Sequence, residues 1–164
     1  MISLEKQIVN ILGPIDTTTD ASKATGYVDI SGFTDFSFLV SLGVVTFASA
    51  DTASAVITVE AATSAASSAA EVQVGGYYRL SSTVGTDTWG AVTAFGATTG
   101  IAVDADGDNK LIEIAIDPSA LPALLDTGKF LRVVMTEGEN TAFVMGVMAI
   151  GTPRYAGATM VSAS

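Results

Sequence analysis

The clearest pattern in the chain is an alternation of apolar residues with small, mostly polar ones in its first third. The apolar positions of this alternation are Phe36, Phe38, Val40, Leu42 and Val44. A period of two places successive side chains on opposite faces of an extended chain. The segment therefore predicts a half-buried β-strand. The chain before it predicts a short strand ending at Ile30 and a turn at Ser31-Gly32.

Similar alternations recur along the chain and predict further strands. They lie at residues 55–62, 71–80 with a break at Gly75-Gly76, 88–95, 101–103, 110–116, 129–136 and 141–150. Many short strands separated by turn residues are typical of an antiparallel sandwich. The sequence therefore predicts an all-β fold, an antiparallel β-sandwich or a jelly roll.

The most regular part of the pattern lies in the last third. Residues 129–136 place Leu131, Val133 and Met135 on one face, and Glu137–Asn140 has the composition of a turn. We therefore predict a hairpin that joins this strand to the one at 141–150. Because residues 141–150 are apolar on both faces, that strand should lie in the centre of a sheet or against a second layer.

The N-terminal segment leaves two alternatives open. We divide the chain into residues 1–15, an arm or edge strand that Gly13-Pro14 should end, and residues 16–164, a single β-sandwich domain. Residues 16–25 are polar and predict a loop. The apolar segment either packs onto the body as an edge strand or docks on a neighbouring subunit. In the second case an interface would use Ile2, Leu4, Ile8 and Val9.

The net charge of the chain limits the classes of partner that it is expected to bind. The chain has 7 Lys and Arg residues against 17 Asp and Glu residues, a formal net charge of −10. A field of that sign repels nucleic acid and anionic membranes, so we predict neither as a partner. Residues 1–12 contain charges within their apolar run and do not read as a signal peptide. The sequence contains no run of about 18 apolar residues, the length that a membrane-spanning helix needs.

The missing residue types argue against catalysis. The chain contains no Cys and no His. Disulfides, thiolate metal sites and Ser-His triads are therefore excluded, and the commonest general base is absent. We predict that the protein is not an enzyme and uses no cofactor.

One acidic turn is a weak candidate for a metal site. Its carboxylates, Asp104, Asp106 and Asp108, occupy alternate positions and could converge on calcium. An EF-hand loop, however, needs Gly at its sixth position and Glu at its twelfth. Here Gly107 is the fourth residue and Ala115 the twelfth. Asp and Gly are also common in ordinary turns, so we predict no specific metal site.

The segment after the last predicted strand is a candidate contact surface. Pro153 should end the hydrogen-bonded ladder, and Arg154 with Tyr155 offers a stacking and bidentate contact group. We consider Arg154 and Tyr155 as interface residues. The alternative is a strand end that carries a surface arginine.

Three short motifs resemble a known family. They are Val-Asp-Ile-Ser-Gly-Phe at 28–33, Lys-Phe-Leu-Arg-Val-Val at 129–134, and Ala-Ile-Gly-Thr-Pro-Arg-Tyr at 149–155. Together they resemble small capsid decoration (cement) or head accessory proteins of tailed bacteriophages, over roughly residues 8–156. Residues 61–99 depart from the family pattern. The resemblance implies a β-sandwich or jelly roll on the virion capsid surface, often a homotrimer, bound to the major capsid protein lattice without enzymatic activity.

A binding module is the alternative function. The same strands would suit an adhesin-like or carbohydrate-binding β-sandwich, with calcium at the acidic turn as an option. This alternative predicts that Tyr77, Tyr78 and Trp89 form one exposed platform.

Overall fold

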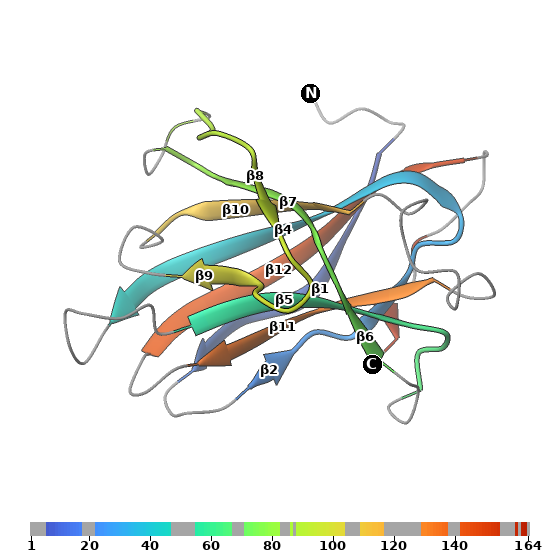
Figure 1. Ribbon diagram of the computed structural model, residues 1–164, viewed down its shortest axis with the longest axis horizontal. Coiled ribbons are helices and arrows are strands. Elements are labelled where there is room, and N and C mark those ends of the chain that lie inside the picture. Colours follow the sequence, from blue (N-terminus) through green and yellow to red (C-terminus); the bar gives the residue numbers. More distant parts are fainter. Residues whose placement is uncertain are drawn as a thin grey trace.

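The alternating segments form two antiparallel sheets that pack face to face in a β-sandwich (Figure 1). The predicted fold class is therefore confirmed. The structure is a computed structural model that describes residues 6–17, 22–46, 55–66, 71–82, 86, 88–103, 109–116, 129–137, 142–154, 160 and 162–163.

The first sheet, here called the β4 sheet, is built around the strand that the sequence marks most clearly. Its strands in spatial order are β1 (Gln7–Thr17), β12 (Ala142–Pro153), β4 (Phe33–Thr46), β10 (Leu111–Ile116), β7 (Gly76–Leu80) and β8 (Thr93–Phe95). β12 pairs with β1 on one side and with β4 on the other. This confirms the prediction that the strand apolar on both faces is central.

The second sheet, here called the β5 sheet, faces the first. Its main path is β13 (Ser162–Ala163), β3 (Tyr27–Asp29), β11 (Phe130–Glu137), β5 (Ala55–Ala62) and β6 (Glu71–Val74). Two short strands also belong to this sheet. β2 (Lys23–Ala24) pairs with β11, and β9 (Ile101–Val103) pairs with β5.

The core lies between the two sheets and consists of apolar residues at alternate positions of the strands. Each sheet contributes the apolar side chains of its inner face to one continuous cluster. Fully or nearly fully buried members include Phe38, Val40, Ile57, Val59, Ile112, Ile114, Leu131, Val133 and Met135. Burial of such side chains is the main favourable term in folding. The apolar faces predicted for β4, from Phe36 to Leu42, and for β11 are confirmed.

A β-bulge reverses the alternation at the end of β4. Leu42 lies opposite Met145, whereas Val45 lies opposite Phe143, so Gly43 and Val44 together face one residue of β12. The extra residue turns the following side chains over. Val44 is 59% exposed and Val45 is buried. The prediction that Val44 faces the core was therefore wrong.

Two glycines allow the chain to cross from one sheet to the other. β6 belongs to the β5 sheet and β7 to the β4 sheet, so the predicted break at Gly75-Gly76 is confirmed. A Cβ at Gly75 would lie 2.6 Å from the carbonyl oxygen of Phe95, and one at Gly76 would lie 2.6 Å from that of Ala115. These distances leave no room for a larger residue.

The predicted hairpin between residues 129–136 and 141–150 was wrong. β11 and β12 lie in different sheets. β11 is paired with β5 from Phe130 to Glu137 and with β2 and β3 on its other side, so both of its edges are occupied. A short polar connection suits either a hairpin or a crossing between two packed sheets, and the local sequence does not separate them.

The N-terminal strand is longer than its composition suggested. β1 continues through Gly13-Pro14 to Thr17, so the prediction that Gly-Pro ends this segment was wrong. Polar residues 16–17 and 23–24 are in strands rather than in the predicted loop. β1 is an edge strand, where a residue without a backbone N–H is tolerated. The pairing of β1 with β12 also shifts register between Leu12 and Ile15, the stretch that contains Pro14.

Candidate functional site

The outer face of the β4 sheet carries an apolar patch. We call it the β12 patch, and its members are Ile8, Leu39, Val44, Val144, Met148 and Ile150. Pairing places Ile8 beside Ile150, and Met148 beside Leu39. Ile8 is 42% exposed and Val144 39% exposed. The patch itself contains no charged residue, so it presents apolar area to a partner without a charge to desolvate.

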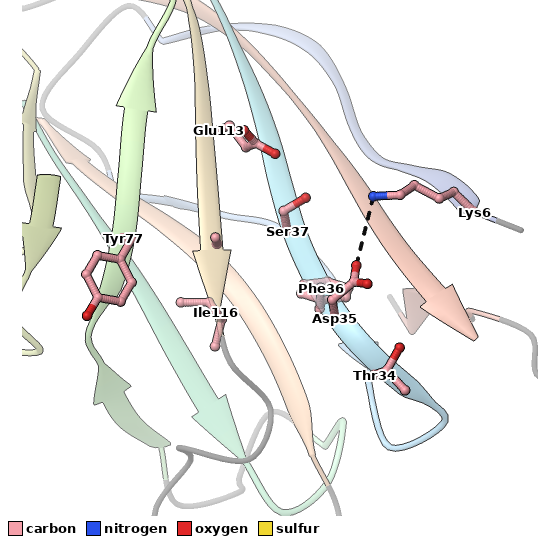
Figure 2. Close-up of a pocket in the computed structure, with 9 residues that line it drawn as sticks. Lys6, Thr34, Asp35, Phe36, Ser37, Tyr77, Glu113 and Ile116 are labelled. Atoms are coloured by element: carbon pink, nitrogen blue, oxygen red, sulfur yellow. Dashed lines mark ion pairs between the residues drawn. The ribbon is translucent and has the colours of Figure 1, made fainter. Parts of the chain in front are cut away.

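A groove lies next to this patch, over β4, β10 and β7 (Figure 2). It has a volume of about 440 Å³ and is lined by Lys6, Thr34, Asp35, Phe36, Ser37, Tyr77, Glu113, Ala115 and Ile116. Ser37, Ala115 and Tyr77 are direct neighbours across the three strands. Tyr77 is 59% exposed and lies on the β7 side of the groove (Figure 2), where its neighbours toward β4, Ala115 and Ser37, have small side chains.

Charged pairs border the groove on two sides. Lys6 Nζ lies 4.0 Å from Asp35 Oδ1, and both side chains are at least half exposed. Such an exposed pair contributes little to stability. On the other side, Arg79 Nε donates to Glu113 Oε2 at 2.5 Å. The Arg79 guanidinium also lies 4.7 Å from the centre of the Trp89 ring, a cation–π contact.

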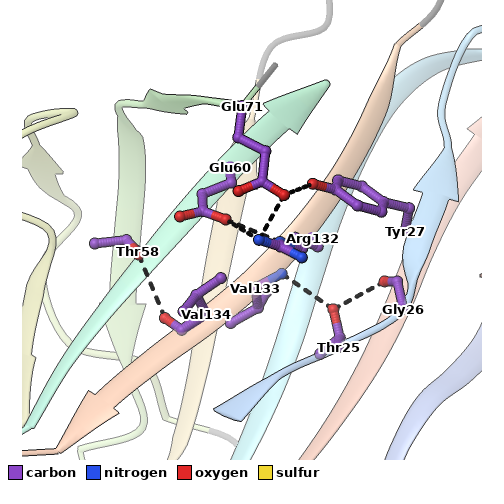
Figure 3. Close-up of polar contacts among 9 residues, drawn as sticks. All are labelled: Thr25, Gly26, Tyr27, Thr58, Glu60, Glu71, Arg132, Val133 and Val134. Atoms are coloured by element: carbon purple, nitrogen blue, oxygen red, sulfur yellow. Dashed lines mark hydrogen bonds and ion pairs between the residues drawn. The ribbon is translucent and has the colours of Figure 1, made fainter. Parts of the chain in front are cut away.

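The outer face of the β5 sheet carries a connected polar cluster around Arg132 (Figure 3). Arg132 Nε and Nη2 both lie 2.8 Å from Glu60 Oε2, and Nη2 lies 2.7 Å from Glu71 Oε1. The Tyr27 hydroxyl donates to Glu71 Oε1 at 2.5 Å, and the Tyr27 ring lies 4.8 Å from the Arg132 guanidinium carbon. These contacts bind four strands of one sheet together.

The cluster shifts the pKa of two of its members. Burial, followed by the hydrogen bond to Glu71, raises the pKa of Tyr27 well above its ordinary value. Burial by itself would lower the pKa of Arg132, but the hydrogen bond and charge of Glu60 outweigh it, so that pKa is also raised. The cluster therefore favours a neutral tyrosine and a charged arginine, which is the pattern of a structural contact.

The structure places some of the residues predicted to form an interface. Ile8 faces outward in the β12 patch, whereas Val9 is partly buried and packs against the core. The backbone N–H of Arg154 donates to the Gly32 carbonyl at 2.8 Å, and its Nε donates to the Phe33 carbonyl at 3.0 Å. Arg154 thus holds the turn before β4. Ile2, Leu4 and Tyr155 lie outside the described residues.

The weak metal candidate also lies outside that part of the chain. Asp104, Asp106 and Asp108 are not among the described residues. Within the described ranges, the acidic side chains form no group of three or more that could hold a metal ion. Those same ranges contain no helix long and apolar enough to cross a bilayer.

The predicted platform of three aromatic residues was wrong for Tyr78. Tyr77 and Tyr78 are neighbours on β7 and point to opposite faces. Tyr78 packs against the core and meets Phe95 edge to face, with 6.3 Å between ring centres. Tyr77 remains on the outer face, and Trp89 stacks there with Arg79.

The three motifs of the resemblance lie together at one end of the sandwich. Leu131 pairs with Val28, and the Ile30 N–H donates to the Lys129 carbonyl at 2.8 Å. Arg154 bonds to the 32–33 segment, as described above. The motifs therefore form one corner of the fold, where β3, β4, β11 and β12 meet.

The groove is the feature that sequence reasoning missed. Four segments far apart in the chain supply it: residue 6, residues 34–37, residue 77 and residues 113–116. Alternation indicates that Ser37, Glu113 and Ala115 point away from the core. It does not indicate that they lie beside Tyr77, because strand order and register set that.

Comparison with known proteins adds little. No family model and no curated protein matches the chain. Among solved structures, one chain of a "Structure of infectious bursal disease virus Gt strain" is 10% identical, with a TM-score of 0.22. That alignment covers 99% of this chain and 45% of that chain, so this chain spans less than half of its length. A TM-score this low supports no argument about fold or function.

Proposed function

We propose that the protein is a structural virion protein, a capsid decoration (cement) protein that binds and stabilises a tailed-phage head shell without catalysis. The observation that carries this proposal is the β12 patch, an apolar surface on the outside of a sheet. The three motifs described above supply the class of partner, the major capsid protein lattice.

The patch suits attachment to a large surface. Association through apolar area gains free energy from the release of water, and exposed apolar patches mark such contacts. The chain as a whole carries a net charge of −10. The members of the patch are themselves uncharged, so covering them removes no charged group from water. Specific interfaces need more than about 1,000 Å² in total, so the contact would extend from the patch over the neighbouring part of the β4 sheet.

The protein would act as a homotrimer on the shell. Three linked copies bind a repeating lattice with higher avidity than one, because the second and third contacts become intramolecular. Light scattering should give a solution mass near three times 16.6 kDa. A mass of one chain, both free and when eluted from shells, would contradict the trimer.

Shell binding can be tested by co-sedimentation with shells assembled from the major capsid protein of the same virus. We expect the wild-type protein to sediment with the shells and Ile8→Asp to bind at least about tenfold more weakly, a loss of about 1.4 kcal/mol. Val92→Asp is the matched control, since Val92 is 64% exposed and lies outside the patch.

The possible failures have separate meanings. If the wild-type protein does not sediment with the shells, the proposed function is wrong. If it sediments but Ile8→Asp and Val92→Asp bind equally well, the β12 patch is not the contact.

A further inference from the structure

We propose that the groove over β4, β10 and β7 is a binding site for an uncharged oligosaccharide. This activity goes beyond attachment to a shell and does not depend on it. Tyr77 is 59% exposed although it stands on a sheet face rather than in a loop. Its neighbours in register are Ala115 on β10 and Ala94 on β8, and Ser37 lies beyond Ala115 on β4. All three side chains are too small to cover the ring. The ring therefore stays open to solvent at the β7 side of the groove.

The groove combines the two kinds of contact that a sugar needs. An exposed aromatic ring offers a flat apolar surface for the C–H face of a pyranose. The other lining residues include polar groups that can form hydrogen bonds with hydroxyls: the carboxylates of Asp35 and Glu113, and the hydroxyls of Thr34 and Ser37. Carboxylates accept hydrogen bonds, and hydroxyls both donate and accept. A ligand rich in hydroxyls satisfies this set without bringing a charge.

The charges of the groove disfavour other classes of ligand. Asp35 is paired with Lys6, and Glu113 with Arg79, so neither carboxylate is an uncompensated charge that would call for a cation. An anionic ligand would meet two carboxylates and one lysine on a protein with a net charge of −10. A strand-like peptide cannot add to β4 or β10, because both edges of these strands are already paired.

The chain provides its own reporter for this site. Arg79 joins the groove residue Glu113 to Trp89, through an ion pair on one side and ring stacking on the other. Trp89 is the single tryptophan of the chain. A sugar that bonds to Glu113 should move Arg79 and thereby change the fluorescence of Trp89.

The test is a titration of the wild-type protein with neutral hexasaccharides, followed by Trp89 fluorescence and by backbone amide NMR shifts. The probes are cellohexaose, laminarihexaose, maltohexaose and N-acetylchitohexaose, with hexagalacturonic acid as the anionic comparison. We expect at least one neutral probe to bind with a Kd of about 1 mM or below. The amide shifts should centre on Ser37, Tyr77 and Ala115.

Three variants show whether the groove is the site. Tyr77→Ala removes the ring, and Ala115→Leu fills the floor; each should weaken binding at least about tenfold. Both positions are exposed, so the variants should keep the fold, which thermal unfolding checks. Val92→Ala removes exposed apolar area elsewhere and should bind like the wild type.

Several results would overturn the proposal. One is the absence of binding by every neutral probe at about 10 mM. Another is equal affinity of the wild type, Tyr77→Ala and Ala115→Leu for a bound sugar, which would place the sugar elsewhere. A third is binding of hexagalacturonic acid as tight as that of the neutral probes.

Discussion

The outer faces of the two sheets differ: one carries polar side chains that are bonded to one another, and the other carries exposed apolar side chains. On the β5 sheet, Arg132 is held by Glu60, Glu71 and the ring of Tyr27, so polar groups satisfy one another. On the β4 sheet, the β12 patch leaves apolar side chains such as Ile8 open to solvent. The charged pairs of that face stand at the groove beside the patch.

This difference assigns the two faces different roles: the β5 face contributes to stability, and the β4 face is suited to binding a partner. A polar cluster whose groups bond to one another holds strands together, but it leaves few hydrogen-bond donors or acceptors for a partner. An uncovered apolar surface adds little to the stability of the free protein and gains free energy only when it is covered. We therefore expect substitutions on the β5 face to change unfolding, and substitutions on the β4 face to change binding.

The largest expected effect comes from Arg132→Leu. This change leaves Glu60 and Glu71 close together, with side chains only 14% and 30% exposed and without their cation. Breaking a largely buried ion pair by removing one partner is strongly destabilising, and we expect a loss of about 2–3 kcal/mol in the free energy of unfolding. Urea unfolding at pH 7 measures it.

Arg79→Leu is the matched control on the other face. It breaks the Arg79–Glu113 pair, whose side chains are 39% and 29% exposed. Water can replace much of that contact, so the expected loss is below about 1 kcal/mol. Equal losses for Arg79→Leu and Arg132→Leu would remove the contrast between the two faces.

A smaller effect should appear at alkaline pH through Tyr27. Its pKa is raised in the folded protein, whereas a tyrosine in the unfolded chain ionises near 10. Above that pH the unfolded chain releases a proton that the folded protein retains, so the stabilisation from the raised pKa is lost as pH rises. At pH 7, Tyr27→Phe should cost about 1 kcal/mol for the bond to Glu71.

The stability difference between the wild type and Tyr27→Phe should therefore narrow between pH 9 and 11, as measured by urea unfolding at fixed ionic strength. Tyr77→Phe, on an exposed tyrosine outside the cluster, is the control for loss of a phenol. A gap between the wild type and Tyr27→Phe that stays constant would show that the proton on Tyr27 is not linked to folding.

The smallest expected effect is that of Ile8→Val in the β12 patch. Ile8 is 42% exposed, so loss of one methylene should change the free energy of unfolding by less than about 0.5 kcal/mol. The same change at Ile112, which is 1% exposed on the inner face, should cost about 1 kcal/mol. A comparable loss at both positions would mean that Ile8 already packs against the body.

The alternation of apolar residues within each strand predicted most of the buried faces, but it predicted few of the contacts on the outer faces. The alternation around Ile112 and Leu131 is a property of each strand alone, so the buried faces could be read directly. The bulge at Val44 depends on the partner strand β12. β11 and β12 lie in different sheets, where β11 pairs with β5 and β12 pairs with β4. These features depend on register between distant segments, which a single sequence does not display.

The candidate surfaces depend on register even more strongly. Arg132 alternates with buried residues and could be placed outside, but its contact with Glu60 requires the β5–β11 pairing that puts them opposite each other. The alternation within β7 separates Tyr77 from Tyr78, but only the pairing of β7 with β10 places Tyr77 beside Ala115. Residue types thus indicate what a side chain can do, and strand order decides which groups act together.

The place of β12 between β1 and β4 has a consequence for synthesis on the ribosome. β4 ends at Thr46, and its neighbour β12 begins only at Ala142. At about 5–20 residues per second, that interval lasts on the order of ten seconds. During this time the β12-facing edge of β4 has no permanent partner. β1 and this edge of β4 must therefore wait for β12, and both are open to mispairing until it emerges.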